Sequence, residues 1–562
     1  MLRPTSRSVG FGLLLALSGP AAGTCGCKRA GPDASDAPTL AASEPASSPT
    51  GSAAEGAASG EPSASGSTLP EIPVVAGHRL VDLDGALHAP PPLPPGRVRL
   101  AALGWVTPVQ KKPDPGASRL GTLRAGAVVA ASPEVAGTTG CPGGWHAVEP
   151  AGYVCVGEGS ATLAVDHPVV SATRPPDFTR RLPYMYGIVT RGGPLYARVP
   201  SQADLGEHEP NLDKHLQKWR DDAVSGARYG LDVWLRWTEG TPPDALAALR
   251  EGTTDEAPFF LRDGGVGPNV SGLVKSPSAV KVDEAKRRTG RSFIHSFLSE
   301  GRRYNVTPDL LVAPADRFRP IRGSEFHGWR VAADGATAEP EAVRFPFALV
   351  RREGARKWRW DGKKMVDDGP LAWRSAVLLT GKQKFHREVL HFETVDGFWV
   401  DDRHAGRTDP AKKWPKWAKN GQKWIDVNIT KQTLVAYEGM RAAYTTLVST
   451  GEAGLADAED TTATKKGIFR VHTKFVSVTM DSKVVGEEFE LRDVPYVQYF
   501  EEGYALHGAY WHDKFGSPKS HGCINLSPED ARRLFFWTDP PVPAGWHSAA
   551  EPLTGTVVFV HP

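Results

Sequence analysis

The stretch YALHGAYWHDKFGSPKSHGCINL, residues 504–526, decides the fold and the chemistry of the C-terminal part of the chain. A short apolar run ends at His507, a polar loop follows, and Cys523 lies in the segment after that loop. Acyl transfer from a peptide amide needs a thiolate, a base that generates it and hydrogen-bond donors for the oxyanion. A cysteine thiol is only a few per cent ionised near neutral pH, so an imidazole is its usual partner. We therefore predict Cys523 as the nucleophile and His507 as its base.

The glycines beside these two residues are predicted to support the reaction. Gly522 lets the backbone approach a ligand closely, and the N–H of Cys523 is the candidate oxyanion donor. The carbonyl of Gly508 is expected to turn toward the imidazole of His507 and to fix its tautomer, as a buried carboxylate does in other triads.

Regular strand patterns surround this stretch. In WIDVNI, residues 424–429, apolar and polar residues alternate as in a half-buried strand, and residues 433–437 form its predicted hairpin partner. Further short strands are predicted at 443–449, 467–474, 475–479, 497–500 and 504–506. A helix is predicted over 527–535, where Ser527 caps and Pro528 takes the first helical position. This spacing predicts a β-sandwich or open barrel with a short helix after the cysteine loop.

The segment from about 422 to 562 resembles the catalytic domain of the L,D-transpeptidases, the YkuD-like family. The resemblance rests on His507-Gly508, then a polar loop, then residues 520–525 (SHGCIN), in family order and spacing. Residues 424–428, 449–451 and 467–469 support it, whereas Lys465-Lys466 stand where many members have a proline. It covers about a quarter of the chain and implies the L,D-transpeptidase sandwich fold.

The resemblance also implies an activity and roles for the residues of the motif. Cys523 would attack the carbonyl after the third residue of a peptidoglycan stem tetrapeptide, release the terminal D-alanine and pass the acyl group to an amine of a neighbouring stem. His507 matches the general base and acid, and Gly508 the carbonyl that orients it. Ser520 and His521 line the site, where they and Gly522 support oxyanion or substrate contacts, and Asn525 matches a family position that holds Arg or Asn. No cofactor and no metal is implied.

Other readings stay open at this point. Transfer and hydrolysis use the same acyl-enzyme, so an L,D-carboxypeptidase or another hydrolase of the family is the first alternative. A non-catalytic wall-binding lipoprotein is the second, although every motif residue is present. His507, His512, His521 and Cys523 offer metal-ligand types, but their spacing matches no closed zinc pattern.

The N-terminus is typical of an export signal. Arg3 and Arg7 precede an apolar run at 11–17, which is too short to span a bilayer as a helix. Cys27, after Gly26, resembles the lipid-attachment site of bacterial lipoproteins; Cys25 fits this pattern less well, and simple secretion is the alternative. We expect an exported protein of the periplasm or cell envelope, anchored by lipid to the inner or outer membrane.

The positions of the other cysteines in the sequence predict different roles for them. Cys141 and Cys155 lie close together in sequence, and in an exported chain such a pair predicts a disulfide. Cys25 and Cys27 belong to the signal boundary. Cys523 is then left over as a reactive thiol, in agreement with its predicted role.

Composition divides the rest of the chain, which is predicted to be multidomain and mainly β. Residues 28–95 are an Ala/Ser/Gly/Pro-rich linker that we expect to be disordered, and 96–165 are a small β domain with a loose resemblance to bacterial SH3-like domains. Residues 166–420 are mixed and mainly β, with a helix expected over 283–300, and 421–562 are the catalytic domain. The formal net charge of +2 argues against nucleic-acid binding, so the expected partners are peptidoglycan stem peptides.

Overall fold

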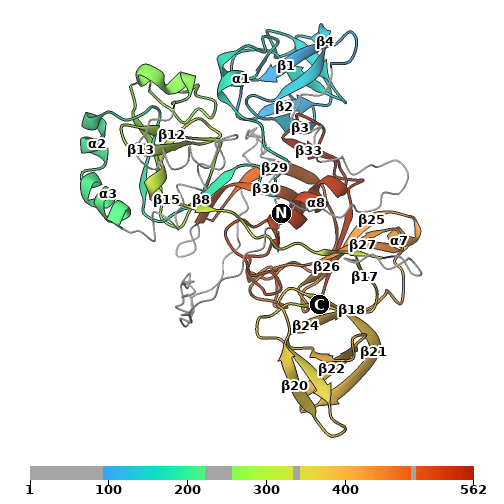
Figure 1. Ribbon diagram of the computed structural model, residues 1–562. Helices are drawn as coiled ribbons and strands as arrows, with labels where there is room; N and C mark the ends of the chain where they lie inside the picture. The colour runs from blue at the N-terminus through green and yellow to red at the C-terminus, as the bar shows by residue number, and fades with distance from the viewer. Residues whose placement is uncertain (1–92, 179, 222–255, 277, 333–341, 483–488) are drawn as a thin grey trace, which may run out of the picture.

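The computed structural model describes residues 93–178, 180–221, 256–276, 278–332, 342–482 and 489–562. The predicted signal region 1–27, with Cys27, and nearly all of the linker 28–95 lie outside the described residues. Figure 1 shows a central part in orange and red, with a blue part above it, a green part at upper left and a yellow part below. No helix within the described ranges is both long and apolar enough to cross a membrane. The prediction of a multidomain, mainly β chain is confirmed.

The central part contains two sheets that face each other across a hydrophobic core. One sheet has the strand order β17-β16-β27-β26-β25-β34-β28, and the other contains β33, β29, β30, β31 and β32. The elements are β16 (Trp329–Val331), β17 (Ala342–Val343), α7 (Lys416–Lys419), β25 (Lys423–Asn428), β26 (Thr433–Glu438), β27 (Arg441–Leu447), β28 (Gly467–Arg470), β29 (Thr473–Ser482), β30 (Phe489–Glu501), β31 (Tyr504–Gly508), β32 (Ile524–Leu526), α8 (Pro528–Trp537), β33 (Ser548–Ala550) and β34 (Val557–His561).

The alternation in residues 424–429 produces the central strand β25. Ile425 and Val427 enter the core between the two sheets. Trp424 packs on the other face, where its ring stacks on Tyr437 with centroids 4.2 Å apart. Its polar positions Asp426 and Asn428 are only partly buried, so the strand is half-buried as its alternation predicted, except at Trp424.

The helix α8 follows the cysteine loop and is held at both ends. Ser527 accepts a hydrogen bond from the backbone N–H of Asp530 at 3.1 Å, and Pro528 occupies the first turn. The carboxylate of Asp530 is buried, which raises its pKa, and it accepts the hydroxyl of Tyr444 at 2.6 Å. At the other end the ammonium of Lys474 donates to two helix-terminal carbonyls, those of Phe535 and Thr538. The helix thereby fixes the strand that precedes it.

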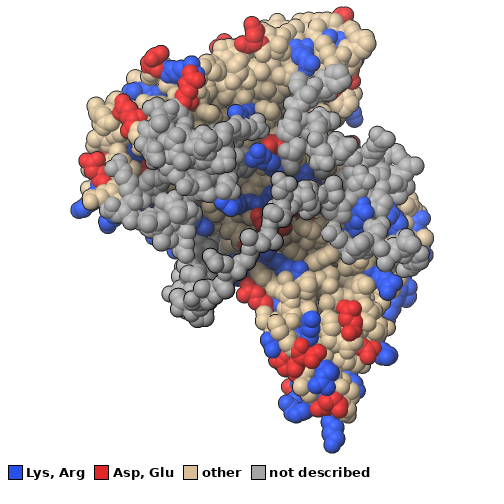
Figure 2. Space-filling model, in the orientation of Figure 1, with Lys and Arg blue, Asp and Glu red and all other residues tan. Residues whose placement is uncertain are grey.

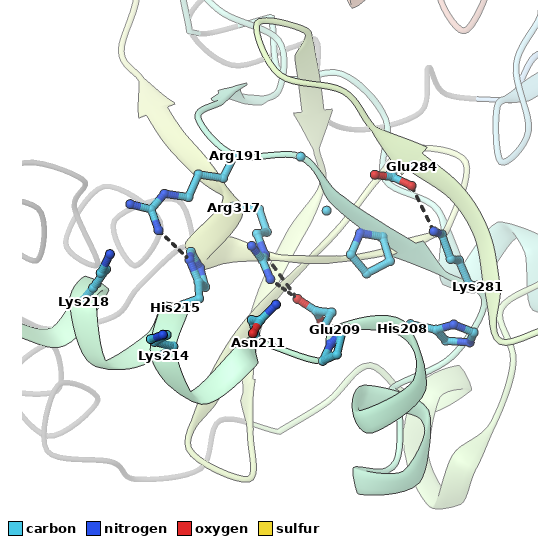
Figure 3. Close-up of a pocket in the computed structure, with 14 residues that line it drawn as sticks. Arg191, His208, Glu209, Asn211, Lys214, His215, Lys218, Lys281, Glu284 and Arg317 are labelled. Atoms are coloured by element: carbon cyan, nitrogen blue, oxygen red, sulfur yellow. Dashed lines mark hydrogen bonds and ion pairs between the residues drawn. The ribbon is translucent and has the colours of Figure 1, made fainter.

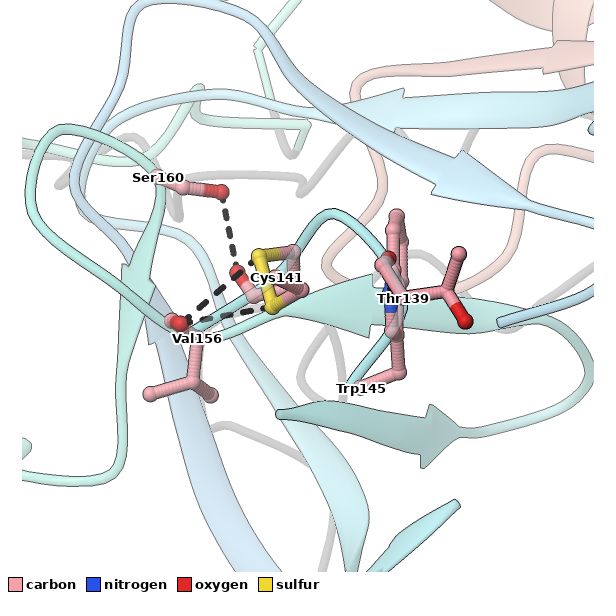
Figure 4. The surroundings of a disulfide bond; sticks show 6 residues. Thr139, Cys141, Trp145, Val156 and Ser160 are labelled. Atoms are coloured by element: carbon pink, nitrogen blue, oxygen red, sulfur yellow. Dashed lines mark hydrogen bonds between the residues drawn. A yellow bond between two sulfur atoms is a disulfide. The ribbon is translucent and has the colours of Figure 1, made fainter. Parts of the chain in front are cut away.

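The blue part in Figure 1, residues 93–165, is a small antiparallel unit around its own apolar core. Its strands are β1 (Val98–Ala102), β2 (Thr107–Gln110), β3 (Arg119–Leu123), β4 (Val128–Gly137), β5 (Trp145–Val148), β6 (Tyr153–Cys155) and β7 (Ala161–Thr162), followed by α1 (Pro168–Ala172). Cys141 and Cys155 form a disulfide between the loop before β5 and the end of β6 (Figure 4). The disulfide closes a loop between Cys141 and Cys155. The indole N–H of Trp145, within this loop, donates to the carbonyl of Thr139 at 2.8 Å.

The green part covers residues 185–321. It comprises β8 (Met185–Val189), β9 (Gly193–Tyr196), α2 (Gln202–His208), α3 (Leu212–Asp221), η1 (Phe259–Gly264), β10 (Lys281–Ala285), β11 (Gly290–Phe293), β12 (His295–Ser299), β13 (Arg302–Val306), β14 (Val312–Pro314), η2 (Ala315–Arg317) and β15 (Phe318–Ile321). The helix expected over 283–300 is wrong, because this segment forms β10, β11 and β12. Gly290 shows the reason: a side chain there would meet the hydroxyl of Tyr510, so the residue lies against the central sheet and not on a helix surface.

The yellow part is a seven-stranded sheet that projects below the centre. Its strands are β18 (Phe347–Val350), β19 (Arg356–Trp360), β20 (Met365–Pro370), β21 (Ala376–His386), β22 (Val389–Thr394), β23 (Trp399–Asp401) and β24 (Ala405–Thr408). Figure 2 shows acidic and basic side chains mixed over this projection, consistent with the low net charge of the chain. The predicted middle region 166–420 therefore contains this sheet and a five-stranded sheet of its own (β10-β9-β14-β13-β12), and it contributes β8, β11, β15, β16 and β17 to the two other sheets.

The parts are joined by shared sheet edges as well as by the chain. Strand β3 of the blue part pairs with β33 of the centre, with Gly121 opposite Ala549. On the other side β11 of the green part pairs in parallel with β30, with Gly290 opposite Leu491. One mixed sheet thus runs from the green part through the centre into the blue part.

Candidate active site

Two adjacent strands bring the predicted base and nucleophile together. β31 and β32 are parallel, with Leu506 opposite Ile524 and His507 opposite Asn525. Because successive side chains of a strand point to opposite faces, Leu506 and Ile524 enter the core while His507 and Asn525 point the other way. Cys523, two residues before Asn525, lies on that same face. Cys523 directly precedes β32, so the pairing brings its backbone next to β31, the strand that carries His507.

The thiol of Cys523 is nearly enclosed. The residue is 8% exposed, and its sulfur lies 3.6 Å from the carbonyl oxygen of Gly503. Gly522 precedes it with φ +120°, a conformation that L side chains rarely adopt. A Cβ at Gly522 would also lie 2.9 Å from the ring of Tyr504. The turn that presents the thiol thus requires glycine for both its backbone and its space.

Ser520 closes this turn from inside. Its hydroxyl accepts the backbone N–H of Gly522 at 3.2 Å and donates to the carbonyl of Cys523 at 2.5 Å. One buried hydroxyl therefore satisfies two backbone groups of the turn. Ser520, predicted to line the site, thus stabilises the turn. The N–H of Gly522 is already bonded to the hydroxyl of Ser520.

The segment 449–451 holds the cysteine loop from the side. Ser449 exchanges two backbone hydrogen bonds of 2.9 Å with Asn525, and Gly451 bridges to Ser520. The side chain of Gln432 supports this segment by accepting the N–H of Thr450 at 2.9 Å. These contacts give a structural reason for the 449–451 motif in the sequence.

The imidazole of His507 is set up as a base. It is 2% exposed and stacks on Trp511, with ring centroids 5.7 Å apart and planes inclined by 29°. Burial lowers its pKa from 6.5 to about 4, and the backbone carbonyl of Gly508 opposes this shift. Nδ1 makes no hydrogen bond within the described part of the chain, so the Gly508 carbonyl acts as a nearby dipole. At neutral pH the ring is uncharged and able to take a proton.

Asn525 completes this face with an amide whose orientation is set by His512. The NH₂ group of Asn525 lies 2.8 Å from Nε2 of His512, and Nδ1 of that ring accepts the backbone N–H of Lys514 at 3.2 Å. Burial, reinforced by His507, lowers the pKa of His512 to about 3, so its ring is uncharged at neutral pH. The amide oxygen Oδ1 of Asn525 takes the other buried position, which no described group bonds.

His521 lies at the outer side of the loop. It is exposed, and its ring is 5.5 Å from that of Phe489 at the start of β30. It is thus adjacent in sequence to the thiol turn but does not share its enclosure. This position suits contact with a substrate that covers the loop.

The structure places all seven predicted residues of the motif in one locality: Cys523, His507, Gly508, Ser520, His521, Gly522 and Asn525. It adds Trp511, Tyr504 and His512, which the sequence analysis did not assign to the site. The stacking of Trp511 and the packing of Tyr504 have no sequence signal, because both depend on how β31 and the loop turn. His512 carries a weak signal, since it belongs to the same polar loop as the motif.

The remaining candidates lie apart from this site or do not form one. The disulfide Cys141–Cys155 belongs to the blue part, in another sheet region. Within the described residues no group of three or more His, Cys, Asp or Glu side chains is placed to hold a metal ion. The sequence alternative of a zinc site therefore receives no support from the geometry.

A comparison with protein families matches residues 422–560 to the L,D-transpeptidase catalytic domain, YkuD. The chain matches no curated protein. The loose resemblance of residues 96–165 to SH3-like domains is not confirmed by these comparisons and stays a prediction.

Solved structures of L,D-transpeptidases are similar to about a quarter of this chain. The catalytic domain from E. faecium is 24% identical over 25% of this chain and 98% of its own, with a TM-score of 0.20. The L,D-transpeptidase from Xylanimonas cellulosilytica is 25% identical over 27% of this chain and 65% of its own, with a TM-score of 0.19. That from Stackebrandtia nassauensis is 28% identical over 27% of this chain and 58% of its own, with a TM-score of 0.18.

The family match and the motif coincide in the two-sheet central part, where β31 carries His507 and its partner β32 directly follows Cys523. Residues 422–560 of this chain are thus similar to the L,D-transpeptidase catalytic domain, YkuD.

Proposed function

We propose that the chain is a peptidoglycan L,D-transpeptidase that works through a thioester on Cys523. The observation that carries this proposal is the pairing of β31, which carries His507, with β32, which directly follows Cys523, inside the region that matches the family. The base is neutral and buried, and the buried thiol follows a glycine turn.

Acylation follows from these groups. The thiol of Cys523 gives its proton to the imidazole of His507, and the sulfur attacks the carbonyl between the third and fourth residues of a stem tetrapeptide. The carbon–nitrogen bond breaks, the imidazolium returns the proton to the leaving amine, and D-alanine departs. The acyl group remains on sulfur as a thioester.

Deacylation repeats the same steps with a new nucleophile. An amine of a neighbouring stem peptide loses its proton to His507 and attacks the thioester carbon. The carbon–sulfur bond breaks, the sulfur is reprotonated, and an amide cross-link is formed. With water as the nucleophile, the same intermediate gives a shortened stem and no cross-link, which is the carboxypeptidase alternative.

Asn525 is proposed as a substrate contact in both steps. Its NH₂ group lies against His512, and its amide oxygen Oδ1 is buried with no described donor. A backbone N–H of the bound stem peptide would satisfy this oxygen, and an unsatisfied buried acceptor of this kind costs about 1–3 kcal/mol until it is bonded. His521, exposed beside the loop, is proposed to contact the substrate from outside.

The deciding experiment incubates the purified protein with disaccharide tetrapeptide and follows the products by mass spectrometry. Cross-linked dimers are expected from the wild type, and tripeptide alone would establish hydrolysis instead. Cys523→Ala is expected to give neither product while it keeps the wild-type circular dichroism spectrum. A carbapenem should add covalently to the wild type and not to Cys523→Ala; product formation by Cys523→Ala would refute the proposal.

The location of the protein is a separate proposal that rests on the sequence alone. We propose export to the cell envelope and lipid attachment at Cys27, with the linker 28–95 giving the enzyme reach toward the wall. Mass spectrometry of the mature N-terminus tests this. A diacylated Cys27 is expected, and an unmodified N-terminus upstream or downstream of Cys27 would refute lipidation.

A further inference from the structure

A second cavity lies in the green part, away from the cysteine site. It has a volume of about 410 Å³, within the range of sites for small ligands. Four pieces of backbone surround it: the turn between β8 and β9, the connection from α2 to α3, the strand β10, and η2 (Figure 3). Its lining is dominated by charged side chains, and the balance of these charges decides what it can bind.

The floor of the cavity is a buried ion network whose charges cancel. Glu209 accepts Nη1 and Nη2 of Arg302 at 2.8 and 3.0 Å, and Nη2 of Arg317 at 2.5 Å. Asp316 accepts Nε of Arg302 at 2.8 Å. Two guanidinium groups thus face two carboxylates, and the pKa of Asp316 is lowered below its usual value because these contacts outweigh its burial. This network fixes the floor and leaves no net charge there.

His215 extends the network to the mouth of the cavity. Its Nε2 donates to Asp316 at 2.8 Å, so its Nδ1 is an acceptor, and Nη1 of Arg191 lies 3.3 Å from that atom. Figure 3 shows Arg191 reaching from the β8–β9 turn to His215 on α3. Arg191 is therefore held by a ring nitrogen of His215 and not by a carboxylate.

The lysines of α3 add to this charge. Lys214 and Lys218 are four residues apart on the helix, so they share one face, and both line the cavity. Across the described residues, no carboxylate lies within ion-pair distance of Arg191, Lys214 or Lys218. Lys281 differs, because its ammonium pairs with Glu284 at 3.0 Å. Three cations around one cavity thus lack a carboxylate partner among the residues that the structure describes.

We propose that this cavity binds a phosphate group carried by a small molecule or by a polymer of the cell envelope. A lone carboxylate would neutralise one of the three cations, whereas a phosphate monoester carries close to two negative charges and offers three oxygens to Arg191, Lys214 and Lys218. The fixed guanidinium supplies a geometrically defined donor pair, and the lysines supply mobile point charges. The proposal is independent of the reaction at Cys523.

The test is isothermal titration of the purified full chain at low ionic strength. The probes are glycerol 3-phosphate as a monoester, dimethyl phosphate as a diester, and malonate as a dicarboxylate. Saturable binding of a phosphate probe is expected, with monoester preference indicating a small phosphorylated ligand and diester preference a phosphodiester polymer. Equal or tighter binding of malonate would overturn the phosphate assignment, and binding of no probe would overturn the site.

Matched variants locate the binding. Arg191→Gln and the double change Lys214→Gln with Lys218→Gln are each expected to weaken phosphate binding at least tenfold. Lys281→Gln, on the same rim but already paired with Glu284, is the control and should bind within twofold of the wild type. Because these side chains are exposed, unchanged melting temperatures are expected. Equal affinity of Arg191→Gln and Lys281→Gln would contradict the proposal, and Cys523→Ala should bind as the wild type does.

Discussion

His507 and Asn525 are direct partners across the parallel strands β31 and β32. This register puts the base, the amide and, two residues earlier in the chain, the thiol of Cys523 on one face of the sheet. It also puts the apolar residues between them into the core. A shift of one residue would exchange the two sets, so the pairing register itself is a condition for catalysis.

The pH dependence of acylation should reflect the burial of His507. Its pKa is about 4, so the imidazole is neutral above that pH and becomes protonated, and unable to act as a base, below it. The rate of carbapenem acylation, measured by stopped-flow fluorescence, is expected to keep its full value through pH 6 and to fall as the pH approaches 4. An acid limb centred near 6.5 would show that the ring is solvated. Trp511→Ala, which uncovers the ring, should move the limb upward.

Removal of the Asn525 amide should slow acylation without unfolding the domain. Asn525→Ala keeps the two backbone bonds to Ser449 but loses the unpartnered amide oxygen, and a loss of roughly tenfold to a hundredfold in kcat/KM is expected for a contact of about 1–3 kcal/mol. His512→Phe should give a smaller loss in the same direction, because the amide remains but loses its orientation. Wild-type kcat/KM in Asn525→Ala would exclude the contact.

Gly522 should tolerate no side chain, for two separable reasons. Gly522→Ala introduces a Cβ 2.9 Å from the ring of Tyr504 and requires an alanine at φ +120°. Acylation is expected to fall at least a hundredfold. The double variant Gly522→Ala with Tyr504→Leu removes the steric contact and leaves the backbone strain, so partial recovery is expected. Complete recovery would mean that the φ angle of Gly522 is unimportant for acylation. No recovery would mean that the contact with the ring of Tyr504 is unimportant.

The stability of the contact between the blue part and the centre should depend on one buried ion pair. Arg124 donates to Asp493 at 2.6 Å, with side chains 14% and 5% exposed, and its guanidinium lies 3.9 Å above the ring of Trp105. Burial tends to raise the pKa of Asp493, but Arg124 and Ser292 outweigh it and keep it lowered. Arg124→Met leaves the buried carboxylate of Asp493 without its counter-ion. A loss of about 3–5 kcal/mol in the free energy of unfolding, measured with denaturant, is therefore expected.

Arg97 provides the control for that experiment. It also forms an ion pair of 2.6 Å, with Glu149, but both side chains are more than a third exposed. Arg97→Met should cost less than about 1 kcal/mol. Similar losses for Arg97→Met and Arg124→Met would show that burial does not decide the stability of the contact between the blue part and the centre.

The sequence predicted the local elements of the catalytic domain well. The strands at 424–429 and 433–437 became β25 and β26, and the helix at 527–535 became α8, because alternation, a serine cap and a proline at the first turn act over a few residues. The helix expected at 283–300 failed because Gly290 and its neighbours are buried by the central sheet, a contact with residues about 200 positions away. Short-range patterns carry no information about such a partner.

The sequence by itself was enough to predict a nucleophile and a base, since the motif at 507–525 points to Cys523 and His507. Only the tertiary structure decided the state of that site. Burial against Trp511 sets the charge of His507, the neutral ring of His512 sets the direction of the Asn525 amide, and Ser520 with residues 449–451 fixes the turn of Gly522. The physical reason is that bond-forming residue types are encoded locally, whereas desolvation and orientation arise only when distant segments pack together.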